Sequence, residues 1–295
     1  MDHGTPATDL PRTLKIQGDG VQLAADLYAA DRPHGLVMLL HGGGQTRHSW
    51  RATARRLCDA GWSALLYDAR GHGDSDWAVD RDYSIDALTA DLRAATREFG
   101  VAPVLIGASM GGMTSMVAVG EGQVPARALV LVDITPRMET AGLARITAFM
   151  SAAPEGFATL EEAAESVAAY NPHRRQPATV DGLRRNLRLG DDGRWHWHWD
   201  PAFLTIGDEP TRAARFDRLA RAAGRIRVPA LVVRGEQSDV VSEEGVAELV
   251  RTIPGARRVD VPGAGHMLVG DDNDVFTREL LGFLADLSGG TGPRR

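Results

Sequence analysis

Short apolar runs alternate with amphipathic segments along the first half of the chain, and this alternation restricts the fold more than any other feature. Segments with helical periodicity at residues 49–60, 84–99 and 110–119 separate continuous apolar runs at 35–40, 63–67, 104–106 and 128–132. Such runs favour strands that are buried on both faces of a parallel sheet. Strands that alternate with helices in this way predict an open, mostly parallel α/β sheet with right-handed crossovers.

The alternation stops after Asp133 and resumes near residue 230. The patterns in between are helical, at 143–152, 160–170 and 212–223. A strand, a helix, a strand and a final helix then follow at 230–233, 243–251, 258–261 and 274–287. We therefore expect one core domain in two parts with a helical insertion and a flexible tail. The expected bounds are 1–134 and 227–287 for the core, 135–226 for the insertion and 288–295 for the tail.

Composition excludes several classes of protein. The chain has 295 residues, of which 43% are hydrophobic and 24% charged, as in ordinary globular domains and unlike disordered or fibrous chains. Its net charge of −6 argues against a nucleic-acid partner. The single cysteine, Cys58, excludes an intrachain disulfide. No signal-type or membrane-length apolar stretch is visible, so we expect a cytoplasmic protein with no membrane partner. The oligomeric state is left open.

The strongest local pattern is Gly107-Ala108-Ser109-Met110-Gly111, which lies between a predicted strand and a predicted helix. A G-x-S-x-G pattern is informative in this strand–turn–helix context. A nucleophilic serine has to project its hydroxyl from a very sharp turn, and the flanking glycines let the strand and helix backbones approach. The pattern favours Ser109 as a nucleophile. The alternative is a glycine-rich turn without chemistry.

A nucleophilic serine needs a base, and the base needs an orienting acid. His266 follows the predicted strand at 258–261 in a glycine-rich loop, where open α/β sheets place functional groups. Two aspartates compete for the acid, because both follow predicted strands and precede His266 in the chain. We favour Asp239, which follows the strand at 230–233, and keep Asp133 as the alternative. The order serine, aspartate, histidine supports His266 as the base.

A second glycine-rich loop, His41-Gly42-Gly43-Gly44, follows the apolar run at 35–40. Glycines at this place allow a backbone N–H to turn toward the nucleophile and to supply half of an oxyanion hole. The spacing fits neither a dinucleotide-binding fingerprint nor a phosphate-binding P-loop. This loop therefore predicts a backbone N–H donor for an oxyanion hole, and its spacing argues against a nucleotide cofactor.

Taken together, these motifs resemble the α/β-hydrolase family over nearly the whole chain. The segment from Tyr67 to Ser75 is similar to the family's D-x-R-G-x-G-x-S turn. The resemblance implies a helical cap inserted after the sixth strand, with Ser109 as nucleophile, His266 as base and Asp239 as acid. It also implies that the oxyanion-hole amides belong to Gly43 and Met110. Relatives that open epoxides or remove halides carry aspartate where this chain has Ser109, which argues against those two reactions.

The predicted insertion holds three of the chain's six tryptophans, at Trp195, Trp197 and Trp199. In an extended segment they would face one side, and His196 and His198 the other. The indoles either form an apolar surface for the substrate or fasten the cap to the sheet. No third ligand accompanies the two histidines, so we expect no metal. Further expected pocket residues are Gly44, Tyr170 and Met267.

The reaction expected from these residues is hydrolysis of a carboxylic ester or lactone through an acyl-serine, with no cofactor. The expected partner is a small to medium, apolar substrate molecule. Amide, thioester or carbon–carbon bond hydrolysis would use the same residues. A ligand receptor that retains the triad, or an acyltransferase, is the alternative from another class.

Overall fold

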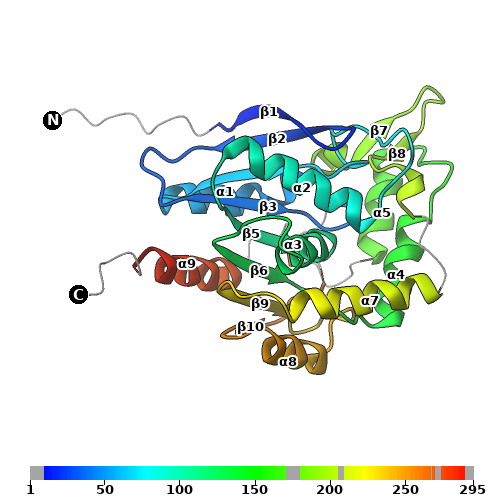
Figure 1. Cartoon of the computed structure of the whole chain (residues 1–295). Helices are drawn as coiled ribbons and strands as arrows, with labels where there is room; N and C mark the ends of the chain where they lie inside the picture. The colour runs from blue at the N-terminus through cyan, green and yellow to red at the C-terminus, as the bar shows by residue number, and fades with distance from the viewer. Residues whose placement is uncertain (1–9, 171–179, 205–208, 267, 270–273, 290–295) are drawn as a thin grey trace, which may run out of the picture.

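The computed structural model describes residues 10–170, 180–204, 209–266, 268–269 and 274–289. Eight strands form one sheet in the order β1-β2-β4-β3-β5-β6-β9-β10, which runs from top to bottom in Figure 1. Only β2 runs antiparallel to its neighbours, and the remaining pairs are parallel. The strands are β1 (Arg12–Gln17), β2 (Gln22–Tyr28), β3 (Leu36–Leu40), β4 (Ser63–Tyr67), β5 (Val104–Ala108), β6 (Ala128–Val132), β9 (Ala230–Gly235) and β10 (Arg257–Val261).

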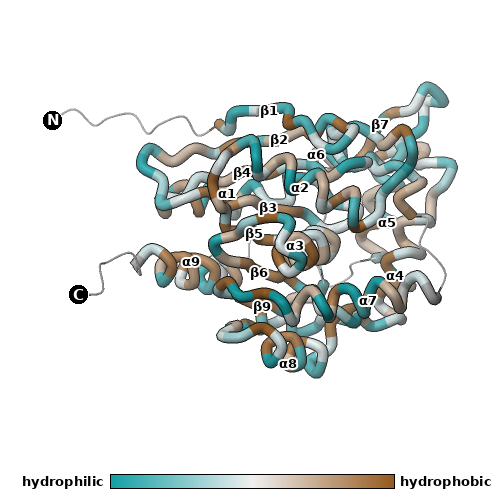
Figure 2. Tube along the Cα trace, viewed as in Figure 1, coloured by the Kyte–Doolittle hydropathy of each residue, from teal (hydrophilic) through white to brown (hydrophobic). Residues whose placement is uncertain are grey.

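Helices cover both faces of the sheet, which confirms the predicted α/β architecture. One face packs against α2 (Ile85–Phe99), α3 (Met110–Gly120), α8 (Glu243–Thr252) and the end of α7 (Glu209–Ala223). The other packs against α1 (Arg51–Asp59) and α9 (Asp274–Gly289). Neighbouring residues of a strand point to opposite faces of the sheet. Because helices cover both faces, every residue of β3, β5 and β6 is buried, which explains the continuous apolar runs in the sequence. Figure 2 shows these strands and α3 as largely apolar.

The helix boundaries follow ordinary capping chemistry. The hydroxyl of Ser84 accepts a hydrogen bond from the Ala87 amide at the start of α2, and Gly100 ends that helix with φ 64°. Ser242 caps α8 in the same way through the Gly245 amide. No helix within the described ranges is long and apolar enough to cross a membrane.

The chain between β6 and β9 leaves the sheet and forms a mostly helical segment, which we call the insertion. It contains a small β-hairpin that the helical periodicity did not predict, and its own apolar cluster around Phe157, Leu160 and Leu187. Its elements are α4 (Thr140–Met150), α5 (Leu160–Tyr170), α6 (Val180–Leu183), η2 (Arg184–Asn186), β7 (Leu187–Leu189), β8 (Trp195–Trp197), η3 (Pro201–Leu204) and α7.

The last turns of α7 belong to the main core and not to the inserted part. Leu219 and Ala222 lie in the large apolar cluster under the sheet. A Cβ at Gly120 would lie 2.2 Å from the carbonyl oxygen of Ala222, so the backbones of α3 and α7 are in contact there. The end of α7 thus packs on the core, although the expected bound of the insertion at residue 226 stays a prediction. The remaining domain bounds stay predictions.

Candidate active site

Ser109 sits in the turn between β5 and α3 with φ 45° and ψ −109°, a conformation that residues with a side chain rarely adopt. The two glycines around it have no space for a side chain. A Cβ at Gly107 would lie 2.3 Å from the carbonyl oxygen of Gly111, and one at Gly111 would lie 2.5 Å from that of Leu40. The G-x-S-x-G spacing is therefore a steric requirement of a turn that holds the serine in a strained backbone.

His266 and Asp133 form a buried pair at the carboxyl edge of the sheet. His266 Nδ1 lies 2.6 Å from Asp133 Oδ2, and the two side chains are 8% and 2% exposed. The carboxylate also accepts hydrogen bonds from the Gly235 amide at 2.9 Å and from the Ser238 hydroxyl at 2.6 Å. Asp133 itself has φ 49° where β6 ends. This geometry orients the imidazole as a base requires.

The structure pairs His266 with Asp133, which was the alternative of the two expected acids. Asp239 is 37% exposed and forms an ion pair at 2.9 Å with Arg145 of α4, so its carboxylate is engaged away from His266. The loop after β9 reaches the site through the neighbouring residue, Ser238, which donates to Asp133. Adjacent side chains in a turn point in different directions, and the sequence order alone did not reveal which of them faces the histidine.

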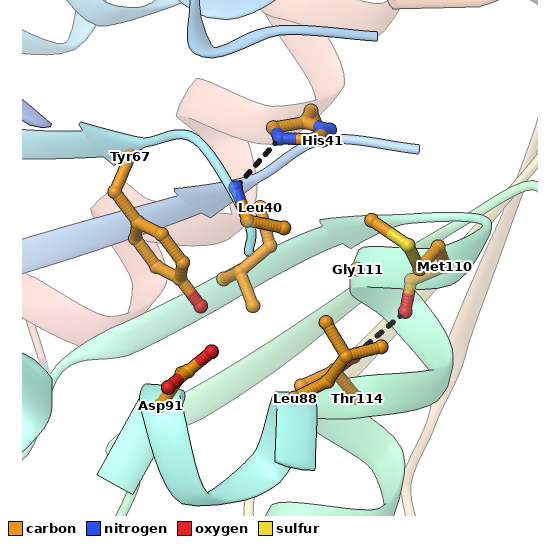
Figure 3. Close-up of a pocket in the computed structure, with 9 residues that line it drawn as sticks. Leu40, His41, Tyr67, Leu88, Asp91, Met110, Gly111 and Thr114 are labelled. Carbon is orange, nitrogen blue, oxygen red and sulfur yellow. Dashed lines mark hydrogen bonds between the residues drawn. The ribbon is translucent and has the colours of Figure 1, made fainter. Parts of the chain in front are cut away.

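The two expected oxyanion donors line the same cavity as Ser109. Met110 begins α3, and Gly43 lies in the loop after β3, which we call the oxyanion loop (residues 42–44). Neither amide has a hydrogen-bond acceptor among the described residues. The side chains behind this loop are tightly packed around a cavity of only about 10 Å³, drawn in Figure 3 with His41 and Met110 on its wall.

A much larger cavity of about 1080 Å³ opens between the carboxyl edge of the sheet and the insertion. Ser109, His266, Gly43 and Met110 line it from the sheet side. Its other walls are mainly apolar and come from α4, α5, the hairpin, η3, α7 and the start of α2. The expected pocket residues Gly44, Tyr170, Trp197 and Trp199 also line it. Trp195 does not, and Met267 lies outside the described residues.

The tryptophan segment shows the predicted alternation in part. Trp197 and Trp199 stack at 4.8 Å between ring centroids and face the cavity, whereas Trp195 packs in the small cluster of the insertion. On the other side, His196 is half-buried and lies 2.9 Å from Asp192, and His198 is buried. His198 thus connects the segment to the loops after β3 and β4, while the indoles of Trp197 and Trp199 form part of the cavity wall. The described part of the chain contains no cluster of three ligands that could hold a metal.

Three residues that contact the site were not predicted in that role from the sequence. Ser238 orients Asp133, and the buried imidazoles of His72 and His198 contact the oxyanion loop. The glycine-rich turn around His72 was noticed, but only for its resemblance to an architectural motif. Nothing local in the sequence marks Ser238 or His198, because their partners lie on other elements.

Comparison with known proteins identifies the family to which the chain belongs. The sequence profile of the alpha/beta hydrolase fold matches residues 35–272. The chain belongs to this family, as its motifs suggested, and it is a hydrolase.

Several known proteins are similar to this chain over most of its length. The esterase Rv0045c of Mycobacterium tuberculosis is 30% identical over 282 residues, which cover 93% of this chain and 90% of the esterase. The 3-hydroxybutyrate-oligomer hydrolase of Cupriavidus necator is 29% identical, with 78% of this chain and 82% of that protein covered. The crystal structure of the M. tuberculosis esterase superposes with a TM-score of 0.73 at 28% identity, covering 94% of this chain and 92% of the other.

Proposed function

We propose that the protein hydrolyses a carboxylic ester or lactone through an acyl-serine, with Ser109, His266 and Asp133 as the triad. The observation that carries this proposal is the 2.6 Å contact between His266 and Asp133 on the wall of the cavity that Ser109 also lines. A base oriented by a buried carboxylate, beside a serine on a strained turn, is the arrangement that nucleophilic acyl transfer needs.

In the proposed reaction His266 Nε2 takes the proton of the Ser109 hydroxyl while the serine oxygen attacks the ester carbonyl. The negative oxygen of the tetrahedral intermediate accepts hydrogen bonds from the Gly43 and Met110 amides. Protonated His266 then gives its proton to the leaving alkoxide, and the acyl-serine forms. Water, deprotonated by His266, attacks the acyl carbonyl and releases the acid and free Ser109.

The cavity supports a substrate with a substantial apolar group. Its volume of about 1080 Å³ lies at the upper limit for ligand sites, and most of its wall is apolar. The stacked indoles of Trp197 and Trp199 provide a rigid surface that suits an acyl chain or ring. The relatives named as an esterase and as a hydroxybutyrate-oligomer hydrolase support ester bonds as the target.

The experiment is a comparison of p-nitrophenyl esters of increasing acyl length, with an amide and a thioester panel beside them. Ser109→Ala is expected to lose ester turnover by about 10³-fold or more, because the nucleophile is absent. The control Ser151→Ala changes an exposed hydroxyl at the end of α4 that does not line the cavity. A fluorophosphonate probe should label Ser109 in the native protein and fail in His266→Ala. Equal turnover by Ser109→Ala would refute the proposal.

A further inference from the structure

Three histidines outside the triad form a buried cluster behind the oxyanion loop. His41, His72 and His198 are 2%, 0% and 1% exposed. The rings of His41 and His72 lie 5.3 Å apart, and those of His72 and His198 lie 5.8 Å apart. They come from the loops after β3 and β4 and from the insertion, so the cluster joins three distant parts of the chain.

The hydrogen bonds of each imidazole define a neutral tautomer. His41 Nε2 accepts from the Ala69 amide at 2.9 Å, which leaves Nδ1–H to donate to the Gly42 carbonyl at 2.8 Å. His72 Nε2 accepts from the Gly44 amide at 3.1 Å, and its Nδ1–H donates to the Arg70 carbonyl. His198 Nδ1 accepts from the Gly73 amide at 2.8 Å, and its Nε2–H donates to the Gly44 carbonyl at 3.2 Å.

These bonds fall on three successive peptide groups of the oxyanion loop, with one histidine to each. His41 holds the carbonyl of Gly42, and the N–H of the same peptide group is that of Gly43. In a trans peptide the C=O and N–H point in opposite directions, so this contact turns the Gly43 N–H away from the cluster. His72 holds the next peptide group through the Gly44 N–H, and His198 holds the third through the Gly44 carbonyl.

A loop of three glycines has little conformational preference of its own, and Gly44 is at φ 73°. Besides the turn hydrogen bond from the Gln45 amide to the Gly42 carbonyl at 3.1 Å, contacts from outside the loop therefore have to fix its peptide planes before a substrate binds. We propose that His198 is a positioning residue of the oxyanion loop, which it holds together with His41 and His72 so that the Gly43 amide faces the reacting carbonyl. This inference rests on the proposed hydrolysis. It also makes the donor geometry depend on the docking of the insertion, since His198 follows β8.

A matched pair of variants separates the two hydrogen bonds of His198. In His198→Gln the side-chain amide reaches the position of Nε2 and can donate to the Gly44 carbonyl. In His198→Asn the side chain reaches only the position of Nδ1 and can accept from the Gly73 amide. Each variant keeps one bond, so a merely structural role would impair both alike. We expect kcat of His198→Asn to fall by about tenfold or more with KM within about twofold, and His198→Gln to retain most of the kcat.

A trifluoromethyl ketone provides a second readout, because its adduct with Ser109 carries an oxyanion. Its affinity should fall in His198→Asn in parallel with kcat. The control His196→Asn changes a half-buried histidine of the same hairpin that does not contact the oxyanion loop in any described hydrogen bond. If the His198 variants do not fold, His72→Gln and His72→Asn make the same comparison, since only glutamine can accept from the Gly44 amide.

The outcomes distinguish this inference from the proposed function. A native protein without ester turnover and without labelling at Ser109 would refute the hydrolysis itself. If the native protein is active, three results would overturn the role of His198. His198→Asn and His198→Gln could be equally active, they could be equally impaired, or they could differ from the native protein only in KM.

Discussion

The carboxylate of Asp133 lies 2.6 Å from Nδ1 of His266, although 133 positions separate the two residues in the chain. The end of β6 supplies the aspartate, and the loop after β10 supplies the histidine. The Gly235 amide and the Ser238 hydroxyl hold the carboxylate from the side of β9. In the proposed mechanism such an acceptor keeps the proton on Nδ1, so that Nε2 can act as the base.

Asp133→Asn should lower kcat for a p-nitrophenyl ester by about 10³- to 10⁴-fold, because an amide can donate to Nδ1 and favour the wrong tautomer. Asp239→Asn should change kcat by less than about threefold, since it removes only a half-exposed ion pair with Arg145. Steady-state kinetics of the two purified variants checks both expectations. A larger loss in Asp239→Asn would restore that residue as the acid.

Two helical glycines should respond in opposite ways to alanine. Gly111→Ala would place a Cβ 2.5 Å from the Leu40 carbonyl oxygen, so the free energy of unfolding should fall by about 3 kcal/mol. Gly282 of α9 is exposed, and its Cβ would meet no described atom within 4 Å, so Gly282→Ala should gain about 1 kcal/mol. Urea titrations measure both changes. Equal stability of the two variants would show that the turn has more room than the geometry allows.

Filling the cavity should shift the acyl-length preference. Ala144 of α4 lines the cavity, and Ala141 of the same helix does not. Ala144→Trp should lower kcat/KM for an octanoyl ester by about tenfold relative to an acetyl ester, since the indole occupies space that the long chain needs. Ala141→Trp is the control and should leave the ratio unchanged. An unchanged ratio in Ala144→Trp would mean that the acyl group binds elsewhere.

The histidine cluster should make stability fall on acidification. Burial lowers the pKa of His41 to about 4 and that of His72 to about 3, and it lowers the pKa of His198 well below its usual value. Below about pH 6.5 the unfolded chain therefore binds protons that the folded protein does not, and each such group removes up to about 1.4 kcal/mol of stability per pH unit. The loss from His41 and His72 ends as pH falls through their folded pKa values.

His198→Gln should reduce this slope, because glutamine does not titrate. Denaturant titrations at about pH 7.5, 6 and 5 compare the variant with the native protein. Above about pH 7 the two slopes should agree, since histidine is neutral in both the folded and the unfolded state. Parallel slopes between pH 6 and 5 would contradict the assignment of a buried, neutral His198.

Much of the fold was predictable because it depends on local patterns. The apolar runs that became β3, β5 and β6 are buried on both faces, and their composition shows this directly. The hairpin of β7 and β8 was missed, since three-residue strands carry no periodicity that distinguishes them from a loop. The end of α7 was assigned to the insertion because its packing on α3 is invisible in its own sequence.

By itself the sequence determined the α/β sheet, the glycine-flanked turn of Ser109 and the place of His266 after a strand. Each of these depends on neighbours within a few residues. The tertiary structure alone decided that Asp133 and not Asp239 contacts His266, and that His198 contacts the Gly44 carbonyl. Those choices depend on the direction of single side chains across different elements. Such directions follow from how the strands and the insertion pack together, and no local pattern specifies them.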